Sequence, residues 1–182
     1  KLRKRQDLSP LFGHWYTEIG PINQIIAIWP YETLQHRRNI RRKAESGLNP
    51  IWPPKTGEFV VRMTSKILLP APFMKPKNAT NMGPIFEMRS YTYMPEDLPD
   101  VLTQWGRSID VRESYSPMIG CWYTNSGGLE NWVHIWAYNT FEDRLKIREE
   151  VSKNGVWPPQ NSPSPIAQTA KIMLSAPFSP LK

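Results

Sequence analysis

One stretch of this sequence occurs twice, and the duplication limits the available folds more than any other feature. Residues 24–37 and 131–144 share Ile, Trp, Tyr, Thr and Arg at matching places, 107 positions apart. Over the longer spans 12–46 and 119–153 there are twelve identities in 35 positions, where average composition would give roughly two or three. Each half of the chain is therefore expected to fold as a copy of one unit.

The second copy contains a full set of elements. Alternating residues predict strands, Pro95 opens a helix with helically spaced apolar residues, and Thr140 is placed as the N-cap of another. The expected order is a strand at 85–93, a helix at 95–113, strands at 118–124 and 131–138, a helix after Thr140 and a strand within 169–178. This order is that of the split βαβ, or ferredoxin-like, arrangement.

The first copy lacks the opening strand and helix. Residues 1–6 align with residues 108–113, near the end of a helix in the second copy, and the closing strand is expected within 64–73. We therefore predict an N-terminally incomplete first repeat at 1–74, a linker rich in Pro, Asn and Lys at 75–84, and a complete second repeat at 85–182.

The two copies also predict how the chain buries its sheets. Helices cover one face of a ferredoxin-like sheet, and residues such as Trp122 or Trp132 would leave the other face apolar. The simplest way to bury that face is against the equivalent sheet of the other copy. The expected fold class is α+β, with tandem ferredoxin-like repeats closing a pseudo-symmetric barrel within one chain.

The net charge of +7 is concentrated in the first copy. The basic-patch candidates share one expected helix and are Arg37, Arg38, Arg41, Arg42 and Lys43. We favour the solvated face of a helix over a nucleic-acid site, because the interleaved aromatic residues of an RNA-reading sheet are missing. Peripheral contact with an anionic membrane surface stays open, but no apolar run approaches the roughly 18 residues of a membrane-spanning helix.

Few residues suggest chemistry. His134 alternates with Trp132 and Trp136 on one face of a strand, so it could project into the barrel as a base or a haem ligand. The ligand-pocket candidates are His134 and the repeated tryptophans Trp122, Trp136, Trp15 and Trp29. Core packing is the favoured alternative, because Ala27 occupies the matching place of His134 in the first copy.

Other catalytic and metal sites are not expected. No His-x-His, Glu-x-x-His or Cys-x-x-Cys spacing is present, and the single cysteine, Cys121, can form neither an internal disulfide nor a zinc site by itself. We predict no catalytic residue, no metal and no cofactor. Glu87 and Arg89 are expected to form a structural salt bridge with Arg144 or Arg148.

Several ordered motifs resemble a known family. The segments Phe86–Tyr93, His134–Tyr138, Arg144–Arg148 and Phe178–Leu181 are similar to those of the NIPSNAP domain. Its copies typically read aromatic-Glu-x-Arg-x-Tyr, then His-x-Trp-x-Tyr, then a C-terminal Ser-Pro-Leu. The second copy matches along nearly its whole length, whereas the first departs at Ala27, where the family histidine would lie.

The resemblance implies a dimeric α+β barrel, formed here as a pseudo-dimer within one chain. It also implies a mitochondrial protein, in the matrix or associated with a membrane, that begins after any targeting peptide. Family members are associated with damaged mitochondria, where they recruit autophagy receptors. The expected function is therefore a non-enzymatic scaffold or adaptor that binds protein partners in mitochondrial quality control and mitophagy signalling.

Two alternatives remain open. The fold relatives of the family include cofactor-free monooxygenases and haem enzymes, so a ligand-binding or monooxygenase-like protein using His134 is one. The other is an accessory subunit of a larger mitochondrial assembly, or a homo-oligomer, which the basic first copy and its missing elements suggest.

Overall fold

The computed structural model describes residues 2–47, 50–77, 81–124 and 130–182. They form one curled antiparallel sheet with the strand order β2-β1-β7-β4-β6-β5-β3. The strands are β1 Gly13–Ile19, β2 Ile25–Ile28, β3 Leu69–Pro70, β4 Ile85–Tyr93, β5 Met118–Tyr123, β6 Glu130–Tyr138 and β7 Ala167–Ser175. The helices are α1 Leu2–Gln6, α2 Leu34–Glu45, α3 Leu98–Glu113 and α4 Phe141–Lys153, with 3-10 turns η1 Gly57–Phe59 and η2 Pro95–Asp97. Residues 78–80 of the expected linker lie outside the described residues.

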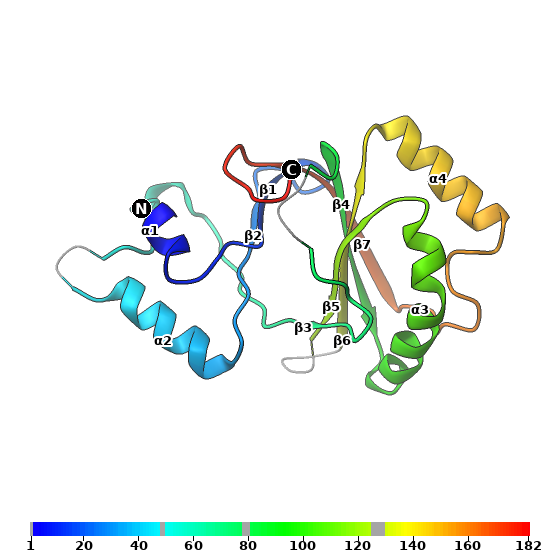
Figure 1. The fold of residues 1–182 in the computed structure, drawn as a ribbon, viewed down its shortest axis with the longest axis horizontal. Coiled ribbons are helices and arrows are strands. Elements are labelled where there is room, and N and C mark those ends of the chain that lie inside the picture. The colour runs from blue at the N-terminus through cyan, green and yellow to red at the C-terminus, as the bar shows by residue number, and fades with distance from the viewer. Residues whose placement is uncertain (1, 48–49, 78–80, 125–129) are drawn as a thin grey trace.

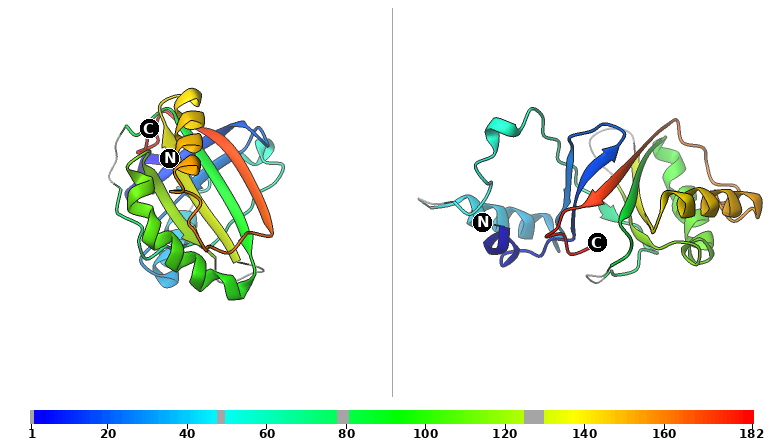
Figure 2. Two further views of the ribbon diagram at one scale, coloured as in Figure 1. Left: turned by 90° about the vertical axis from the view of Figure 1, so that its right-hand side faces the viewer. Right: turned by 90° about the horizontal axis from the view of Figure 1, so that it is seen from above.

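The strands of the second copy are neighbours in the order β7-β4-β6-β5, and β4 pairs with both β6 and β7. Helices α3 and α4 lie together on one side of these strands, at the right of Figure 1 and toward the viewer at the left of Figure 2. Helix α3 buries Leu98, Val101, Trp105 and Ile109, whose spacing of three or four residues puts them on one side of a helix. These residues build the core between the helices and the sheet.

The helices of the first copy lie at the other end of the molecule (Figure 1). Helix α1 corresponds by number to the last turn of α3, as the alignment of residues 1–6 with 108–113 predicts. The Thr33 hydroxyl accepts a hydrogen bond from the backbone N–H of His36, and the Thr140 hydroxyl accepts one from Asp143. Both threonines are therefore N-caps, which confirms the expectation for Thr140.

The first copy joins the second at two places, through β1 with β7 and through β3 with β5. The opposed residues are Trp15 with Ser175 and Tyr16 with Leu174 at one junction, and Trp122 with Pro70 and Tyr123 with Leu69 at the other. Next to each pair, the N–H of Ala176 donates to the carbonyl of His14 and the N–H of Ala71 to that of Cys121, both at 2.9 Å. The two junctions thus use corresponding residues in the same register.

A second apolar core fills the face of the sheet away from α3 and α4. Trp15 on β1 and Trp122 on β5 are buried there, and each follows a glycine by two residues. Because alternate strand residues point to one face, each ring lies over its glycine. A Cβ atom would lie 1.9 Å from the Trp15 ring at Gly13 and 2.2 Å from the Trp122 ring at Gly120. The repeated glycines therefore make room for the repeated tryptophans.

Gly120→Ala is expected to lower the free energy of unfolding by about 1–3 kcal/mol, because the added methyl group must displace a packed indole ring. Urea unfolding followed by tryptophan fluorescence measures the change. Gly57→Ala is the control, since a Cβ there meets no atom within 4 Å. Equal unfolding midpoints for the two variants would show that Trp122 can move at little cost.

The closing strand of the first copy is shorter than expected. Within residues 64–73, where this strand was expected, only Leu69 and Pro70 pair with a neighbouring strand. Its counterpart β7 lies between β1 and β4, whereas β3 has β5 as its sole neighbour in the sheet order. A strand is defined by its hydrogen-bonded pairing with a neighbour. Residues 64–68 have no such neighbour, so they are not part of a strand.

Trp132 lies on the opposite face from the one expected. Its ring is 5.0 Å from that of Trp105 on α3, so it belongs to the core under the helices. Trp132, His134 and Trp136 occupy alternate positions of β6, so their side chains point to the same face of the sheet. Because Trp132 contacts α3, this is the face that the helices cover.

Candidate functional site

Glu87, near the start of β4, is a fully buried carboxylate surrounded by arginines. Its Oε1 lies 2.6 Å from Nη2 of Arg144 and 3.0 Å from Nη1 of Arg89, and its Oε2 lies 3.8 Å from Nη1 of Arg148. Arg89 is two residues along the same strand, whereas Arg144 and Arg148 lie one turn apart on α4. The expected salt bridge is confirmed, and it fastens α4 to the sheet.

Burial alone would raise the pKa of Glu87, but the hydrogen bond from Arg144 and the charges of Arg144, Arg148 and Arg89 outweigh it and lower that pKa. Glu87 is therefore ionised at neutral pH. Three arginines around one carboxylate give this cluster a net charge of +2.

His134, beside this cluster on β6, is buried among aromatic rings. Its Nδ1 accepts a hydrogen bond of 2.7 Å from Nε1–H of Trp136, and its ring lies 4.8 Å from Trp105 and 4.9 Å from Tyr91. Burial, followed by the charges of nearby arginines, holds its pKa well below the usual value. The imidazole is therefore neutral and a weak base, with its acceptor nitrogen already engaged by Trp136.

His134 should make stability depend on pH. Because its folded-state pKa is lowered, the unfolded chain takes up the proton first, and the free energy of unfolding falls as pH drops below about 6.5. His134→Phe should flatten that fall between about pH 6.5 and 5, although His14, whose pKa burial also lowers, keeps part of it. Urea titrations at several pH values measure the slope.

Ile135→Val is the matched control, because it loosens the same strand without removing a titrating group. This variant should keep the slope of the unchanged chain. If the free energy of unfolding falls with pH as steeply in His134→Phe as in Ile135→Val, the result would contradict the burial of a neutral imidazole.

A cavity of about 310 Å³ opens between the face of the sheet that α3 and α4 cover and the segment that follows α4. It is lined by Arg89, Tyr91, Tyr93, Trp105, Arg148, Trp157, Ser162, Gln168 and prolines of the 158–165 segment. The Oγ of Ser162 is buried and has no hydrogen-bond partner among the described residues. A second cavity of about 180 Å³ shares Arg148, Trp157 and Pro158 with it. The larger cavity thus combines cationic groups with aromatic walls.

The ligand-pocket candidates do not come together. Trp15 and Trp122 lie in the interior core, whereas His134 and Trp136 face α3 and the 157 segment. Trp29 is in the first copy, 5.9 Å from Trp52. The expectation that His134 projects into the barrel is wrong, because His134 lies on the helix-facing side of β6.

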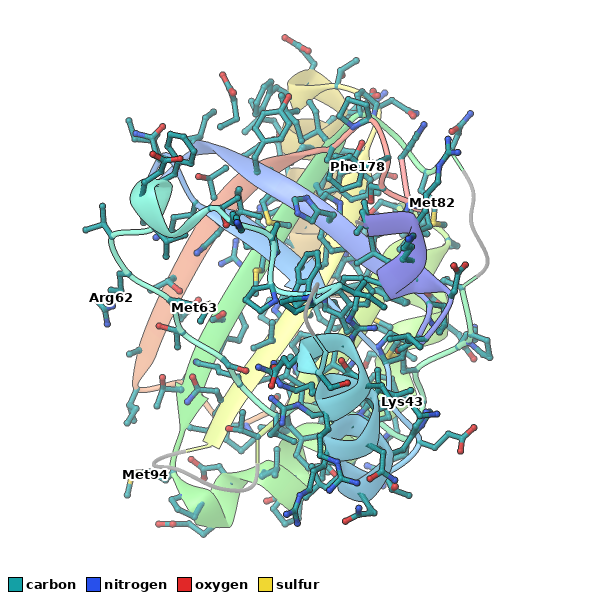
Figure 3. The ribbon with its side chains drawn as sticks, turned by 90° about the vertical axis from the view of Figure 1, so that its left-hand side faces the viewer. Lys43, Arg62, Met63, Met82, Met94 and Phe178 are labelled. Carbon is teal, nitrogen blue, oxygen red and sulfur yellow. The ribbon has the colours of Figure 1, made fainter. Side chains whose placement is uncertain are left out.

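The basic-patch candidates all lie on α2, away from the Glu87 cluster. Arg38, Arg42 and Lys43 are exposed, and Figure 3 shows Lys43 pointing away from the helix. Arg41 pairs with Glu45 at 3.0 Å. Among the described residues, the guanidinium of Arg37 has no hydrogen-bond or ion-pair partner.

Sequence reasoning missed a buried arginine that occurs in both copies. Arg112 on α3 lies 4.1 Å from the Trp136 ring and donates to the hydroxyl of Tyr138 at 3.2 Å. Arg5 on α1 lies 4.3 Å from the Trp29 ring and donates to the hydroxyl of Tyr31 at 2.6 Å. The signal was available, because both arginines fall on the same 107-residue offset as the tryptophans and tyrosines.

Other reactive groups are few. Cys121 is buried, and burial raises its pKa well above the usual value, so the thiol is not poised as a nucleophile. Within the described ranges, no three His, Cys, Asp or Glu side chains are grouped as metal ligands would be. No helix in that part of the chain is both long enough and apolar enough to span a bilayer.

A sequence model of the NIPSNAP family matches residues 1–75 and 86–180. The NipSnap homolog of Dictyostelium discoideum is 32% identical over 153 residues, which cover 82% of this chain and 66% of that protein. NipSnap of Drosophila melanogaster is 26% identical over 85% of this chain and 58% of its own length. NipSnap homolog 3B of Mus musculus is 31% identical over 52% of this chain and 40% of its own length. The chain thus spans between two fifths and two thirds of the length of these relatives.

Solved structures include similar proteins as well. A NIPSNAP domain protein from Burkholderia xenovorans is 26% identical, with a TM-score of 0.46 over 52% of this chain and 96% of its own. A protein from Agrobacterium tumefaciens is also 26% identical, with a TM-score of 0.49 over 54% of this chain and 99% of its own.

Proposed function

We propose that this chain, which belongs to the NIPSNAP family, is a scaffold or adaptor that binds protein partners and catalyses no reaction. The repeats at 1–74 and 85–182, joined by the linker at 75–84, form the two halves of a pseudo-dimeric α+β barrel. The matching registers of β1 with β7 and β3 with β5 support this arrangement.

The observation that carries the proposal is a set of exposed apolar side chains in the first copy. They lie in the β1–β2 hairpin and in the segment that begins with the last residue of η1: Ile19, Ile22, Ile25, Phe59, Val60, Val61, Met63 and Ile67. Large exposed apolar patches on a folded protein mark contact surfaces, because leaving such surface in water is costly. A protein partner would bury these side chains.

The titratable groups give little support to catalysis. The imidazole of His134 is a buried, weak base, and the thiol of Cys121 is buried with a raised pKa. Each arginine of the Glu87 cluster already contacts the carboxylate. Cys121 lies opposite His134 in the register of β5 and β6, but Nδ1 of His134 is engaged by Trp136, and a protonated thiol beside a weak base is a poor nucleophile.

The proposed location is mitochondrial, in the matrix or associated with a membrane, with a role in quality control and mitophagy signalling. This location follows from the family resemblance and agrees with the net charge of +7. Assembly into a homo-oligomer or a larger mitochondrial complex would bury the same apolar surface.

Photo-crosslinking in mitochondria of the source organism tests the adaptor function. A photoreactive amino acid at Val61, which is fully exposed, should capture one or a few proteins reproducibly. The same group at Glu149, exposed on α4 at the other end of the molecule, is the control and should not capture them. If Val61 captures nothing beyond the control, the chain is not an adaptor through this surface.

The second candidate function is binding of a small aromatic anion, and the 310 Å³ cavity favours it. Arg89 and Arg148 supply positive charge, Tyr91 and Trp157 supply aromatic walls, and Ser162 supplies an unpartnered hydroxyl. Titration with 1-naphthoate should raise the melting temperature saturably, and Arg148→Gln should abolish the rise. Lys146→Gln on the same helix is the control, and equal behaviour of both variants would remove this candidate.

A further inference from the structure

Arg112, in the last turn of α3, is a buried cation whose hydrogen-bond partners are neutral. Its side chain is 2% exposed, and it donates to the hydroxyl of Ser116 at 2.8 Å and to that of Tyr138 at 3.2 Å. Burial raises the pKa of Tyr138, so both hydroxyls are uncharged at neutral pH. An arginine stays protonated at that pH. Within the described ranges, the charge of Arg112 therefore contacts no carboxylate.

Two features favour this charge without balancing it. The guanidinium lies 4.1 Å from the centre of the Trp136 ring, and the face of an aromatic ring attracts cations. The negative end of the α3 dipole also favours a cation in the last turn. Neither interaction uses the Nε–H of Arg112, which is buried and has no hydrogen-bond partner among the described residues. This donor is left for a ligand, because a buried N–H without an acceptor is costly.

The charges around Arg112 are mostly positive. Burial lowers the pKa of Arg112 and the charge of Arg148 adds to this effect, whereas that of Glu87 opposes it. Arg89 and Arg144 contact the same carboxylate of Glu87. Four arginines and one carboxylate give this part of the molecule a net charge of +3. An anion beside Arg112 would reduce the repulsion among them.

The smaller cavity, of about 180 Å³, is lined by both Arg112 and Arg148. Arg148 is the most loosely held arginine of the Glu87 cluster, because its distance of 3.8 Å is longer than a hydrogen bond. Ser152 and Pro158 line the same cavity and are exposed, so the cavity opens to solvent. One water molecule needs roughly 10–15 Å³. The cavity therefore has room for an oxyanion of the size of phosphate.

The lining of this cavity suits a phosphate group. Arg112 comes from α3 and Arg148 from α4, two helices that lie together on one side of the sheet (Figure 1). A guanidinium group is a planar fork of N–H donors that matches the oxygens of phosphate or carboxylate. Two such groups favour a phosphate dianion over a single carboxylate. None of the described residues that line the cavity is acidic, and Val151 and Trp157 add apolar surface that strengthens the attraction.

We propose that the smaller cavity binds a phosphate group between the guanidinium groups of Arg112 and Arg148. The group belongs either to free phosphate or to a phosphate ester that extends past Trp157 into the larger cavity, which shares Arg148 and Trp157. The site requires neither the adaptor surface nor the binding of an aromatic anion. All of its residues belong to the second copy, which has its full set of strands and helices.

Thermal unfolding of the whole chain in inorganic phosphate, at constant pH and ionic strength, measures the binding. The melting temperature should rise saturably with phosphate and should not rise with chloride. In a chain labelled with 15N, the Nε–H resonance of Arg112, assigned through its bonds to the backbone, should shift along the same saturation curve. No saturable binding, or binding that leaves this resonance unmoved, would overturn the proposal.

Two variants separate this site from the general stabilising effect of phosphate, which is excluded from protein surfaces. They lie at the rims of the cavities, because replacing the buried Arg112 can unfold the chain. Ser152→Asp puts a negative charge beside the smaller cavity and should weaken phosphate binding by about tenfold or more. Ser164→Asp is the matched control, because Ser164 is exposed and lines the larger cavity and not the smaller one. Equal phosphate affinities of the two variants would overturn the proposal.

Titration with 1-naphthyl phosphate distinguishes the two sources of the phosphate group. An affinity about tenfold or more above that of inorganic phosphate, weakened by both Ser152→Asp and Ser164→Asp, would identify an ester that occupies both cavities. Equal affinities of the two probes, with the loss in Ser152→Asp alone, would identify free phosphate.

Binding elsewhere gives a different result. Resonance shifts confined to α2, where Arg38 and Arg42 are exposed, would assign phosphate to the surface and overturn the proposal. Binding of 1-naphthoate without binding of phosphate would defeat this inference alone. Binding of phosphate without binding of 1-naphthoate would support it and defeat the second candidate function alone.

Discussion

Glu87→Gln is expected to lower the free energy of unfolding by about 3–5 kcal/mol, one of the two largest effects expected of a single substitution in this chain. The carboxylate is fully buried and contacts Arg144, Arg89 and Arg148. Removing its charge leaves the arginines facing one another, with Arg144 and Arg89 mostly shielded from water. Urea unfolding at pH 7 measures the loss.

Glu150→Gln, on the exposed face of α4, is the control for this substitution and should change stability by less than about 0.5 kcal/mol. The effect of Glu87 also depends on pH. Its folded-state pKa is lowered, so its contribution is present above the unfolded pKa of about 4.3 and is lost as pH falls through the folded pKa. The Gln variant should lack this acid-induced fall, and a loss below about 1 kcal/mol at pH 7 would refute the account of the cluster.

Trp105→Ala is the other large effect, with an expected loss of about 3–5 kcal/mol. The Trp105 ring lies 5.0 Å from Trp132, 4.8 Å from His134 and 4.4 Å from Trp157. Its removal opens a cavity at the contact between α3 and the sheet, which neighbouring rings cannot fill without moving. Thermal and urea unfolding both report the loss.

Arg107→Ala is the matched control on α3, because the Arg107 side chain is exposed and lies outside the core. It should unfold within about 0.5 kcal/mol of the unchanged chain. Near-equal stability of Trp105→Ala and Arg107→Ala would mean that α3 is not anchored through its tryptophan.

Much of the fold follows from local patterns. The 107-residue offset predicted the order of elements, including the helical character of residues 2–6 before any strand of the first copy. Thr140 was recognisable as an N-cap because capping needs only residues close in sequence. The Glu87 salt bridge was also predictable, because the spacing of Arg144 and Arg148 puts both on one side of a helix.

The remaining features depend on partners far away in the chain. Alternation placed Trp132, His134 and Trp136 on one face of β6, but it could not say which face the helices cover. Residues 64–73 match the sequence of the closing strand in the second copy, but most of them have no neighbouring strand to pair with. The 310 Å³ cavity was not predictable, because β4, α3, α4 and the 157–168 segment all contribute to its walls.

We propose that this chain binds protein partners through the exposed apolar side chains of the β1–β2 hairpin and of residues 59–67. Hydrogen exchange of the chain, alone and bound to the protein captured from mitochondria through Val61, tests it most directly. The account predicts slower exchange at residues 25–28 and 61–68 together, with little change at residues 157–168. Slower exchange confined to residues 157–168, with residues 25–28 and 61–68 unchanged, would contradict it.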